Sequence, residues 1–241
     1  MIRSAWSRRK RSARLINVGA FCCVAPTSAQ RAIAPIDLTG YWVSVVTEDW
    51  RWRMLTPPKG DASGVPLNIE GRKAADAWDE AHDLKSGDTC RAFGAAGVMR
   101  EPTRLHITWT DDRTLRVDLD AGAQTRTIHF ASAPLHPPVP TLQGSSRASW
   151  ENGGLKVTTT SMLPGYLRKN GVPYSDSAVL TEYFDAVPRQ PNGDDWLVVS
   201  SIVDDPRYLT EPFVTSTHFK READGRGWHP TPCSTRRKLD R

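Results

Sequence analysis

Glu182 is the residue of this sequence whose type and position point most directly to proton-transfer chemistry. In the run 180–184, strand alternation puts Glu182 on the same side as Leu180 and Phe184. A carboxylate on the apolar inner face of a barrel loses its hydration, so it requires a partner that compensates its charge. Two interpretations follow: Glu182 is a general base or acid in proton transfer, or it is one half of a structural Glu–Arg pair.

Proton transfer needs a second titratable group, and two residues qualify. His218 shares one face of a predicted strand with Val214 and Ser216. Of the ionisable side chains, imidazole has the pKa closest to neutral pH. Tyr183 stands next to Glu182 and carries a phenolic hydroxyl. The candidate catalytic set is therefore Glu182 as base with His218 or Tyr183 as acid. The alternative for His218 is a solvated place on the polar face of an edge strand.

The tryptophans are the second set of residues that could have a functional role. Of its nine tryptophans, eight follow residue 29. Each combines a large apolar area with one N–H donor, which suits a pocket for a hydrophobic or aromatic small molecule. Two or three are expected to line such a pocket, and the rest to be core. The ligand-binding candidates are Trp42, Trp50, Trp52, Trp109 and Trp150.

Basic residues accompany two of these tryptophans. In Asp49–Leu55, Trp50 and Trp52 alternate with Arg51 and Arg53, which predicts a half-buried strand. The two arginines either clamp an anionic group or are solvated.

Motifs for cofactor-dependent chemistry are absent from the sequence. It holds no G-x-S-x-G, P-loop, G-x-G-x-x-G, H-E-x-x-H or C-x-x-C-H pattern. A zinc site needs clustered His, Cys and acidic residues. The six histidines are instead scattered, at positions His82, His106, His129, His136, His218 and His229. We therefore expect neither a cofactor nor a metal site.

The first 29 residues have the pattern of a secretory signal peptide. A basic run over 8–14 precedes a moderately apolar stretch and small residues, and cleavage is predicted after Ala29. The chain is then periplasmic or secreted; the alternative is a disordered cytoplasmic tail. No stretch approaches 18 consecutive apolar residues, so no transmembrane segment is expected.

The distribution of charge argues against nucleic acid as a partner. The formal net charge is +5, from 32 Lys and Arg against 27 Asp and Glu. Six of the basic residues and none of the acidic ones lie in the first 29 residues, which leaves 26 against 27 in the remainder. The basic character thus belongs to the leader, and the oligomeric state stays open.

Two cysteines, Cys90 and Cys233, remain once the predicted leader is removed. An even number of cysteines in an oxidising compartment predicts a disulfide between them. The alternative is two unrelated free thiols.

The elements that must position these residues are mainly strands. Nine or ten short runs separated by turns are typical of an antiparallel barrel or sandwich, and closure favours a barrel of about eight to ten strands. One short helix is predicted over Asn68–His82, capped by Asn68. Residues 131–146 and 163–176 are expected to be irregular. The organisation is then a signal peptide over 1–29, one barrel domain over 30–235 and a basic tail over 236–241.

Several short motifs carry a family resemblance. The Gly40-Tyr41-Trp42 entry to the first strand resembles that of lipocalin-type (calycin-like) barrels. The pairs Trp150-Glu151 and Asp204-Asp205, with the run 181–184 between them, resemble the pattern of a widespread group of exported, mostly uncharacterised proteobacterial proteins. The resemblance covers most of residues 36–235 and implies export and a β fold. It implies no activity.

Three functions remain open on this evidence. The leading one is an exported β-barrel that binds a hydrophobic or aromatic small molecule in its cavity. The second is a cofactor-independent barrel enzyme (an isomerase, cyclase, lyase or hydrolase) that uses Glu182 with His218 or Tyr183. The third is an envelope scaffold without a small ligand.

Overall fold

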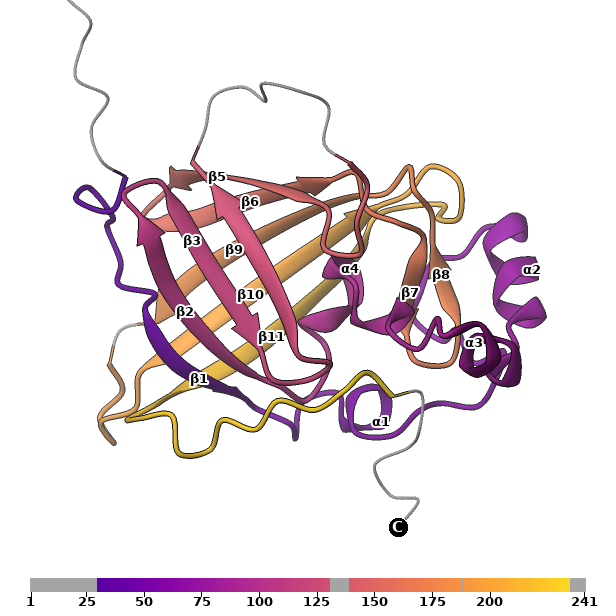
Figure 1. Cartoon of the computed structure of the whole chain (residues 1–241), viewed down its shortest axis with the longest axis horizontal. Helices are drawn as coiled ribbons and strands as arrows, with labels where there is room; N and C mark the ends of the chain where they lie inside the picture. The colour runs from indigo at the N-terminus through magenta and orange to yellow at the C-terminus, as the bar shows by residue number, and fades with distance from the viewer. Residues whose placement is uncertain (1–29, 131–138, 188, 235–241) are drawn as a thin grey trace, which may run out of the picture.

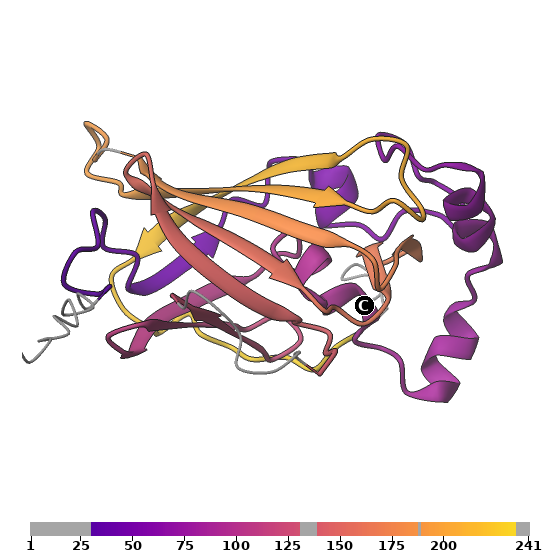
Figure 2. The ribbon, with the colours of Figure 1, turned by 90° about the horizontal axis from the view of Figure 1, so that it is seen from above.

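A computed structural model describes residues 30–130, 139–187 and 189–234. The predicted signal peptide over 1–29 and the basic tail over 236–241 lie outside the described residues. Figure 1 shows a barrel of strands with a lobe of short helices and one hairpin at one end. Seen from above in Figure 2, the lobe extends the barrel along its length.

The barrel is closed and has nine strands in the order β1-β11-β10-β9-β6-β5-β4-β3-β2. Closure comes from the antiparallel pairing of β1 with both β2 and β11, and the contact between β4 and β5 is limited to two residue pairs. The expected barrel of eight to ten strands is thereby confirmed. The strands are β1 Gly40–Ser44, β2 Arg104–Asp111, β3 Thr114–Leu119, β4 Gln124–His129, β5 Ser145–Glu151, β6 Gly154–Thr160, β9 Val179–Val187, β10 Trp196–Asp204 and β11 Phe213–Glu222.

The expectation of a wholly antiparallel barrel is wrong at one pair, because β4 and β5 run parallel. A parallel pair requires a connection that returns to the starting end of the first strand, which a tight hairpin cannot provide. The long connection between His129 and Ser145 is consistent with this requirement.

Alternating residues of each strand fill the barrel. Beside a buried polar minority (Ser44, Arg126, Ser146, Thr159, Glu182, Ser201 and Thr217), the inward side chains are apolar and buried, as the period-2 pattern of the sequence requires. They include Leu105, Ile107, Leu155, Phe184, Leu197 and Phe219. The interior is therefore a packed core.

The lobe contains four α-helices where the sequence predicted one. The helices are α1 Trp50–Arg53, α2 Ile69–Ala77, α3 Glu80–Ser86 and α4 Ala95–Val98, with a 3-10 turn η1 Arg91–Phe93 and a hairpin of β7 Gly165–Arg168 and β8 Val172–Tyr174. The Asn68 side chain caps α2 by accepting from Gly71 N, as predicted. Trp78 has extended backbone geometry and divides the predicted helix into α2 and α3.

The strand predicted over Asp49–Leu55 is instead the short helix α1. Alternation over so few residues is a weak signal when no neighbouring strand is available to pair with. The helical turn buries Arg53 and lets its guanidinium donate to the carbonyl oxygens of Val45 and Arg100. These side-chain bonds hold the chain as it leaves β1.

The described C-terminal residues 223–234, here called the C-terminal strap, run back along the outside of the barrel (Figure 1). Trp228 packs edge-on against the stacked rings of Tyr41 and His106, whose centroids are 4.1 Å apart. Thr231 N then donates to the carbonyl oxygen of Asp120 at 2.8 Å. The strap thus crosses β1 and β2 and reaches the end of β3.

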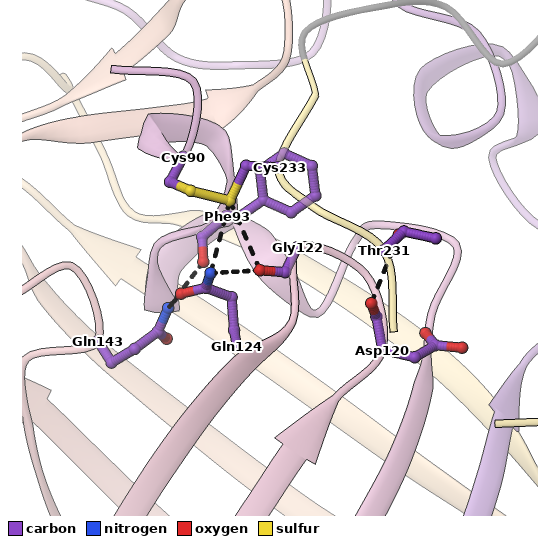
Figure 3. The surroundings of a disulfide bond; sticks show 8 residues. All are labelled: Cys90, Phe93, Asp120, Gly122, Gln124, Gln143, Thr231 and Cys233. Carbon is purple, nitrogen blue, oxygen red and sulfur yellow. Dashed lines mark hydrogen bonds between the residues drawn. A yellow bond between two sulfur atoms is a disulfide. The ribbon is translucent and has the colours of Figure 1, made fainter. Parts of the chain in front are cut away.

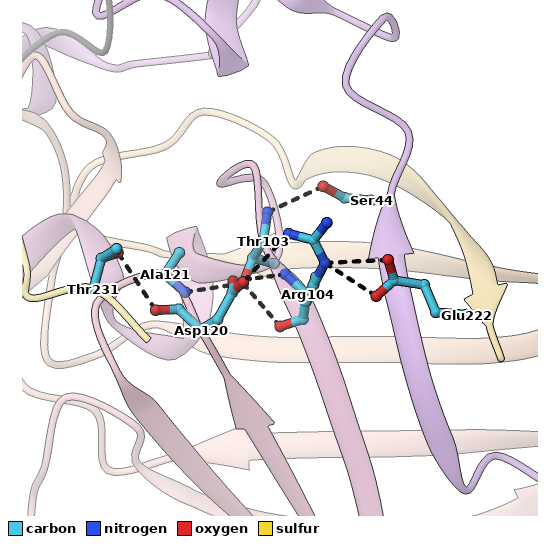
Figure 4. A network of polar contacts seen from close by, with 7 residues as sticks. All are labelled: Ser44, Thr103, Arg104, Asp120, Ala121, Glu222 and Thr231. Carbon is cyan, nitrogen blue, oxygen red and sulfur yellow. Dashed lines mark hydrogen bonds and ion pairs between the residues drawn. The ribbon is translucent and has the colours of Figure 1, made fainter. Parts of the chain in front are cut away.

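A network of polar contacts connects the ends of neighbouring barrel strands near the strap (Figure 4). Asp120 Oδ1 accepts from Thr103 Oγ1 at 3.0 Å and from Arg104 N at 2.7 Å. Thr103 N donates to Ser44 Oγ, and Arg104 Nε donates to both carboxylate oxygens of Glu222. The network joins β1, β2 and β11, so it supports closure of the barrel.

The strap ends in the predicted Cys90–Cys233 disulfide, which is confirmed (Figure 3). Cys90 immediately precedes η1, which with α4 lies across the end of the barrel. The bond therefore ties the end of the described chain to the segment that covers the core, across a sequence separation of 143 residues. Within the described ranges, no helix is long and apolar enough to cross a membrane.

Candidate functional site

Glu182 lies on the inner face of β9 with Leu180 and Phe184, and it is fully buried. Its two carboxylate oxygens accept from Nη1 and Nη2 of Arg126, at 2.9 and 2.5 Å. Arg126 lies on β4, is 1% exposed and also donates to Thr159 Oγ1. The geometry is a bidentate ion pair sealed inside the barrel, of the kind that the structural interpretation of Glu182 requires.

The expected proton-transfer set of Glu182 with His218 or Tyr183 does not assemble. Tyr183 follows Glu182 on the same strand and therefore points to the outer face, where it lies near Lys156. His218 is also half-exposed on the outside, with its Nδ1 2.8 Å from Glu48 Oε1. The barrel wall separates both groups from the carboxylate of Glu182.

Three of the five candidate tryptophans belong to the barrel. Trp42 is buried, and its indole N–H donates to the carbonyl oxygen of Leu38. Trp109 and Trp150 lie on either side of Phe130, with ring centroids 5.6 and 5.1 Å from it. Trp109 and Trp150 are partly buried and pack against the core.

The other two tryptophans lie outside the barrel on α1. Trp50 is exposed, and Trp52 lies between the guanidinium groups of Arg51 and Arg168, at 4.5 and 4.2 Å from its ring centroid. The five tryptophans therefore do not form one ligand site. The expected site inside the barrel is filled by side chains of the core.

A cleft of about 470 Å³ lies outside the barrel, in the lobe. We call it the lobe cleft; residues of α2, α3, η1, β7 and β8 contribute to its walls. Its aromatic lining consists of Trp78, Tyr166, Tyr174 and Tyr208. Its volume lies within the general range of small-molecule pockets in proteins.

The charged part of the lobe cleft is organised around Asp83. This carboxylate is buried on α3, and its Oδ2 accepts from Trp78 Nε1 and from Tyr166 OH, both at 2.8 Å. Burial, together with the hydrogen bond to Asp83, raises the pKa of Tyr166 well above its usual value. Tyr166 therefore remains a donor at all physiological pH values, and the two aromatic walls are fixed in place.

Arg91 is a charged group of the lobe cleft with spare hydrogen-bonding capacity. Its guanidinium lies over the ring of Tyr166 at 4.5 Å, and its Nη1 is 3.7 Å from Asp83 Oδ1. This separation exceeds the usual length of a charge-assisted hydrogen bond. One third of the side chain is exposed. The arrangement leaves guanidinium donors for an anionic group in the cleft.

Tyr174 forms the deep wall of the lobe cleft. It is fully buried, and within the part of the chain that the structure describes its hydroxyl has no hydrogen-bond partner. Burial raises the pKa of Tyr174, so the hydroxyl remains protonated. Gly94 and Gly165 make room for this hydroxyl, because a Cβ at either position would lie within 2.5 Å of it.

Gly171 positions Trp78 in the cleft wall, and replacing it tests that role. Its φ is 79°, and a Cβ there would lie 2.0 Å from the indole ring of Trp78. We expect Gly171→Ala to lower the free energy of unfolding by about 1–3 kcal/mol, through overpacking in addition to backbone strain. Urea denaturation followed by tryptophan fluorescence measures the loss.

Gly87→Ala is the matched control for this change. Gly87 has a φ of 81°, but a Cβ there would meet nothing within 4 Å. Its replacement therefore introduces the backbone strain alone. Equal losses in the two variants would show that Gly171 does not position Trp78.

Sequence reasoning identified part of this cleft and missed the rest. Trp78 lies within the helix that the sequence predicts over Asn68–His82, and Tyr166 lies in the segment 163–176, which the sequence predicts to be irregular. Asp83, Arg91 and Tyr174 carry no local sequence signal, because their burial and contacts in the cleft arise from elements distant in the chain; Asp83, in the middle of α3, is buried against Tyr166 of β7. Among the described residues, no group of three or more His, Cys, Asp or Glu is placed to hold a metal ion.

The fold and the site define a closed, mixed β-barrel that carries a cleft in an external lobe. Comparison of the chain with protein-family models, curated proteins and solved structures finds no match. It therefore gives no support to a lipocalin family or to a proteobacterial origin. The barrel itself is the part of that expectation which the structure confirms.

Proposed function

We propose that this protein is an exported binding protein whose ligand is a small aromatic compound with an acidic group, held in the lobe cleft. The observation that carries the proposal is the position of Arg91, stacked on Tyr166 and only loosely paired with Asp83. Aromatic walls bind a ring, and a guanidinium with free donors binds a carboxylate or sulfonate. The proposal keeps the aromatic ligand expected from the sequence and moves it out of the barrel.

Export is supported by two independent features. Residues 1–29 have the pattern of a signal peptide, and the Cys90–Cys233 bond is of the kind that persists in oxidising compartments. We place the protein in the periplasm or outside the cell on this basis. The catalytic alternative has less support, because Glu182 is paired with Arg126 and closed off from solvent.

The test compares a ring compound with and without its charge. We expect naphthoate to bind the protein saturably, and about tenfold or more tightly than the neutral naphthylmethanol, because a hydrogen bond to a charged group is stronger than a neutral one. Isothermal titration calorimetry measures both affinities. In Arg91→Met, the preference for naphthoate should disappear.

Arg226→Met is the matched control for the loss of one positive charge. Arg226 lies on the strap, is highly exposed and pairs with Asp224. This variant should keep the preference for naphthoate. If neither compound binds saturably, or if Arg91→Met retains the preference, the lobe cleft is not the site proposed here.

A further inference from the structure

A second cavity, of about 350 Å³, lies between the C-terminal strap and the barrel. We call it the strap cavity; its lining comes mainly from the end of β1, the start of β2, the residues that follow β3, and the strap. Figure 4 shows most of its polar lining residues. The volume lies at the small end of the range of small-molecule pockets, so the strap cavity has room for a compact organic molecule.

The positive charge of Arg104, a lining residue on β2, is balanced from outside the strap cavity. Its Nε donates to both carboxylate oxygens of Glu222, at 3.2 and 3.0 Å. Glu222 lies on β11 and does not contribute to the lining. Arg104 therefore brings no unbalanced positive charge into the strap cavity.

The negative charge of Asp120, in contrast, has no cationic partner within hydrogen-bond distance among the residues that the structure describes. Asp120 lines the strap cavity and is 7% exposed. Its Oδ1 accepts from Thr103 Oγ1 and from Arg104 N, whereas its Oδ2 lies 3.8 Å from Arg104 Nη1. This separation is about 1 Å longer than a charge-assisted hydrogen bond. Asp120 Oδ2 thus has unused capacity to accept hydrogen bonds.

The charges of these three side chains do not cancel. Asp120 and Glu222 together carry two negative charges, and Arg104, which lies between them, carries one positive charge. A nearly buried carboxylate is costly unless a cation compensates its charge. The strap cavity is therefore suited to a cationic molecule and not to an anion.

We propose that the strap cavity binds a small organic amine, with its ammonium group on Asp120 Oδ2 and its apolar body against the aliphatic part of the lining. An ammonium group supplies both the missing positive charge and hydrogen-bond donors for Oδ2. The strap cavity shares no lining residue with the lobe cleft, so this inference does not depend on the function proposed above. The apolar lining residues are Val43, Val46, Met54, Pro102 and Ala121.

Isothermal titration of the full chain with two compounds that differ in charge tests the proposal. Cyclohexylmethylamine is cationic at neutral pH, and cyclohexylmethanol is its neutral counterpart of nearly equal size. We expect the amine to bind saturably, and about tenfold or more tightly than the alcohol, because a hydrogen bond to a charged group is stronger than a neutral one. Equal affinities, or an amine that does not bind saturably, would overturn the proposal.

Two variants locate the bound amine. Asp120→Asn keeps an acceptor oxygen for Thr103 and Arg104 N but removes the negative charge, so it should lower the affinity for the amine at least about tenfold and leave that for the alcohol unchanged. Met54→Trp places a large side chain in the strap cavity without altering the polar network, and it should weaken the binding of both compounds. Circular dichroism establishes that each variant is folded; if Asp120→Asn does not fold, Met54→Trp decides the location.

Asp185→Asn is the matched control for the loss of one carboxylate. Asp185 is exposed on β9 and does not contribute to the lining of the strap cavity. This variant should keep the preference for the amine. The proposal is also overturned if folded Asp120→Asn retains that preference, or if Met54→Trp binds the amine as tightly as the original protein does.

Discussion

Glu182→Gln is expected to lower the free energy of unfolding by about 3–5 kcal/mol. The change keeps the size of the side chain but leaves the guanidinium of Arg126 buried without its counter-charge. Arg126 is 1% exposed, so water cannot take the place of the carboxylate without opening the barrel. The loss arises from the uncompensated cation and is larger than the net stabilisation that the intact pair provides.

Two further variants serve as controls for the loss of stability in Glu182→Gln. Glu222→Gln breaks the pair with Arg104 at the partly exposed barrel edge, and we expect it to cost less than about 1 kcal/mol. The double variant Arg126→Met with Glu182→Leu removes both charges and should recover much of the stability lost in Glu182→Gln. Urea denaturation measures all three. A loss below about 1 kcal/mol in Glu182→Gln would contradict the ion pair as drawn.

The same variant bears on the catalytic alternative. A general base whose carboxylate is removed lowers turnover by about two to four orders of magnitude while leaving ligand binding nearly intact. The buried ion pair predicts the reverse: a large loss of stability and no specific effect on the lobe cleft, since Glu182 does not contribute to its lining.

Replacing both Cys90 and Cys233 with serine is expected to cost roughly 5 kcal/mol of stability in the chain-entropy model. The bond joins residues separated by 143 positions, so it excludes a large number of extended conformations of the unfolded chain. It also holds the strap against Gly122, whose carbonyl oxygen accepts from Gln124 Nε2 beside the disulfide. We therefore expect the strap to detach before the barrel unfolds.

Urea denaturation and limited proteolysis separate these two effects. The double serine variant should unfold at lower urea concentration, and protease should cut it first within the strap, between Glu222 and Cys233. Reductant should reproduce both results in the original protein and add nothing in the variant. A stability loss below about 2 kcal/mol with an uncut strap would show that the contacts of Trp228 and Thr231 hold the strap without the bond.

Local patterns in the sequence located most of the barrel. In the sequence, the strand-like runs 178–187, 196–203 and 213–221 lie between polar turns, and they correspond to β9, β10 and β11 to within one residue at each end. Side-chain alternation has a period of two residues, so it can be read without knowing which strands are neighbours. The same rule identified Glu182 as a residue of the inner face.

The lobe was predicted less well, because its elements are short and its strands are buried on both sides. Every residue of β7 and β8 is buried, so neither strand shows alternation, and the segment 163–176 was expected to be irregular. The helix α1 stands where a strand was predicted, because the alternation of Trp and Arg over four residues is too short to distinguish a strand from a helical turn. In the helical conformation of α1, the buried side chain of Arg53 donates hydrogen bonds to the carbonyl oxygens of Val45 and Arg100, and these contacts cannot be read from the local sequence.

By itself, the sequence determined which residues form the barrel strands, which side of β9 carries Glu182, and that Cys90 and Cys233 pair. Only the tertiary structure decided that Arg126 is the partner of Glu182, that His218 lies beyond the barrel wall, and that Asp83 and Arg91 meet in a cleft. The reason is that alternation and capping act between near neighbours in the chain. Ion pairs and clefts depend instead on which strands and loops lie side by side, and Arg126 and Glu182 are 56 residues apart.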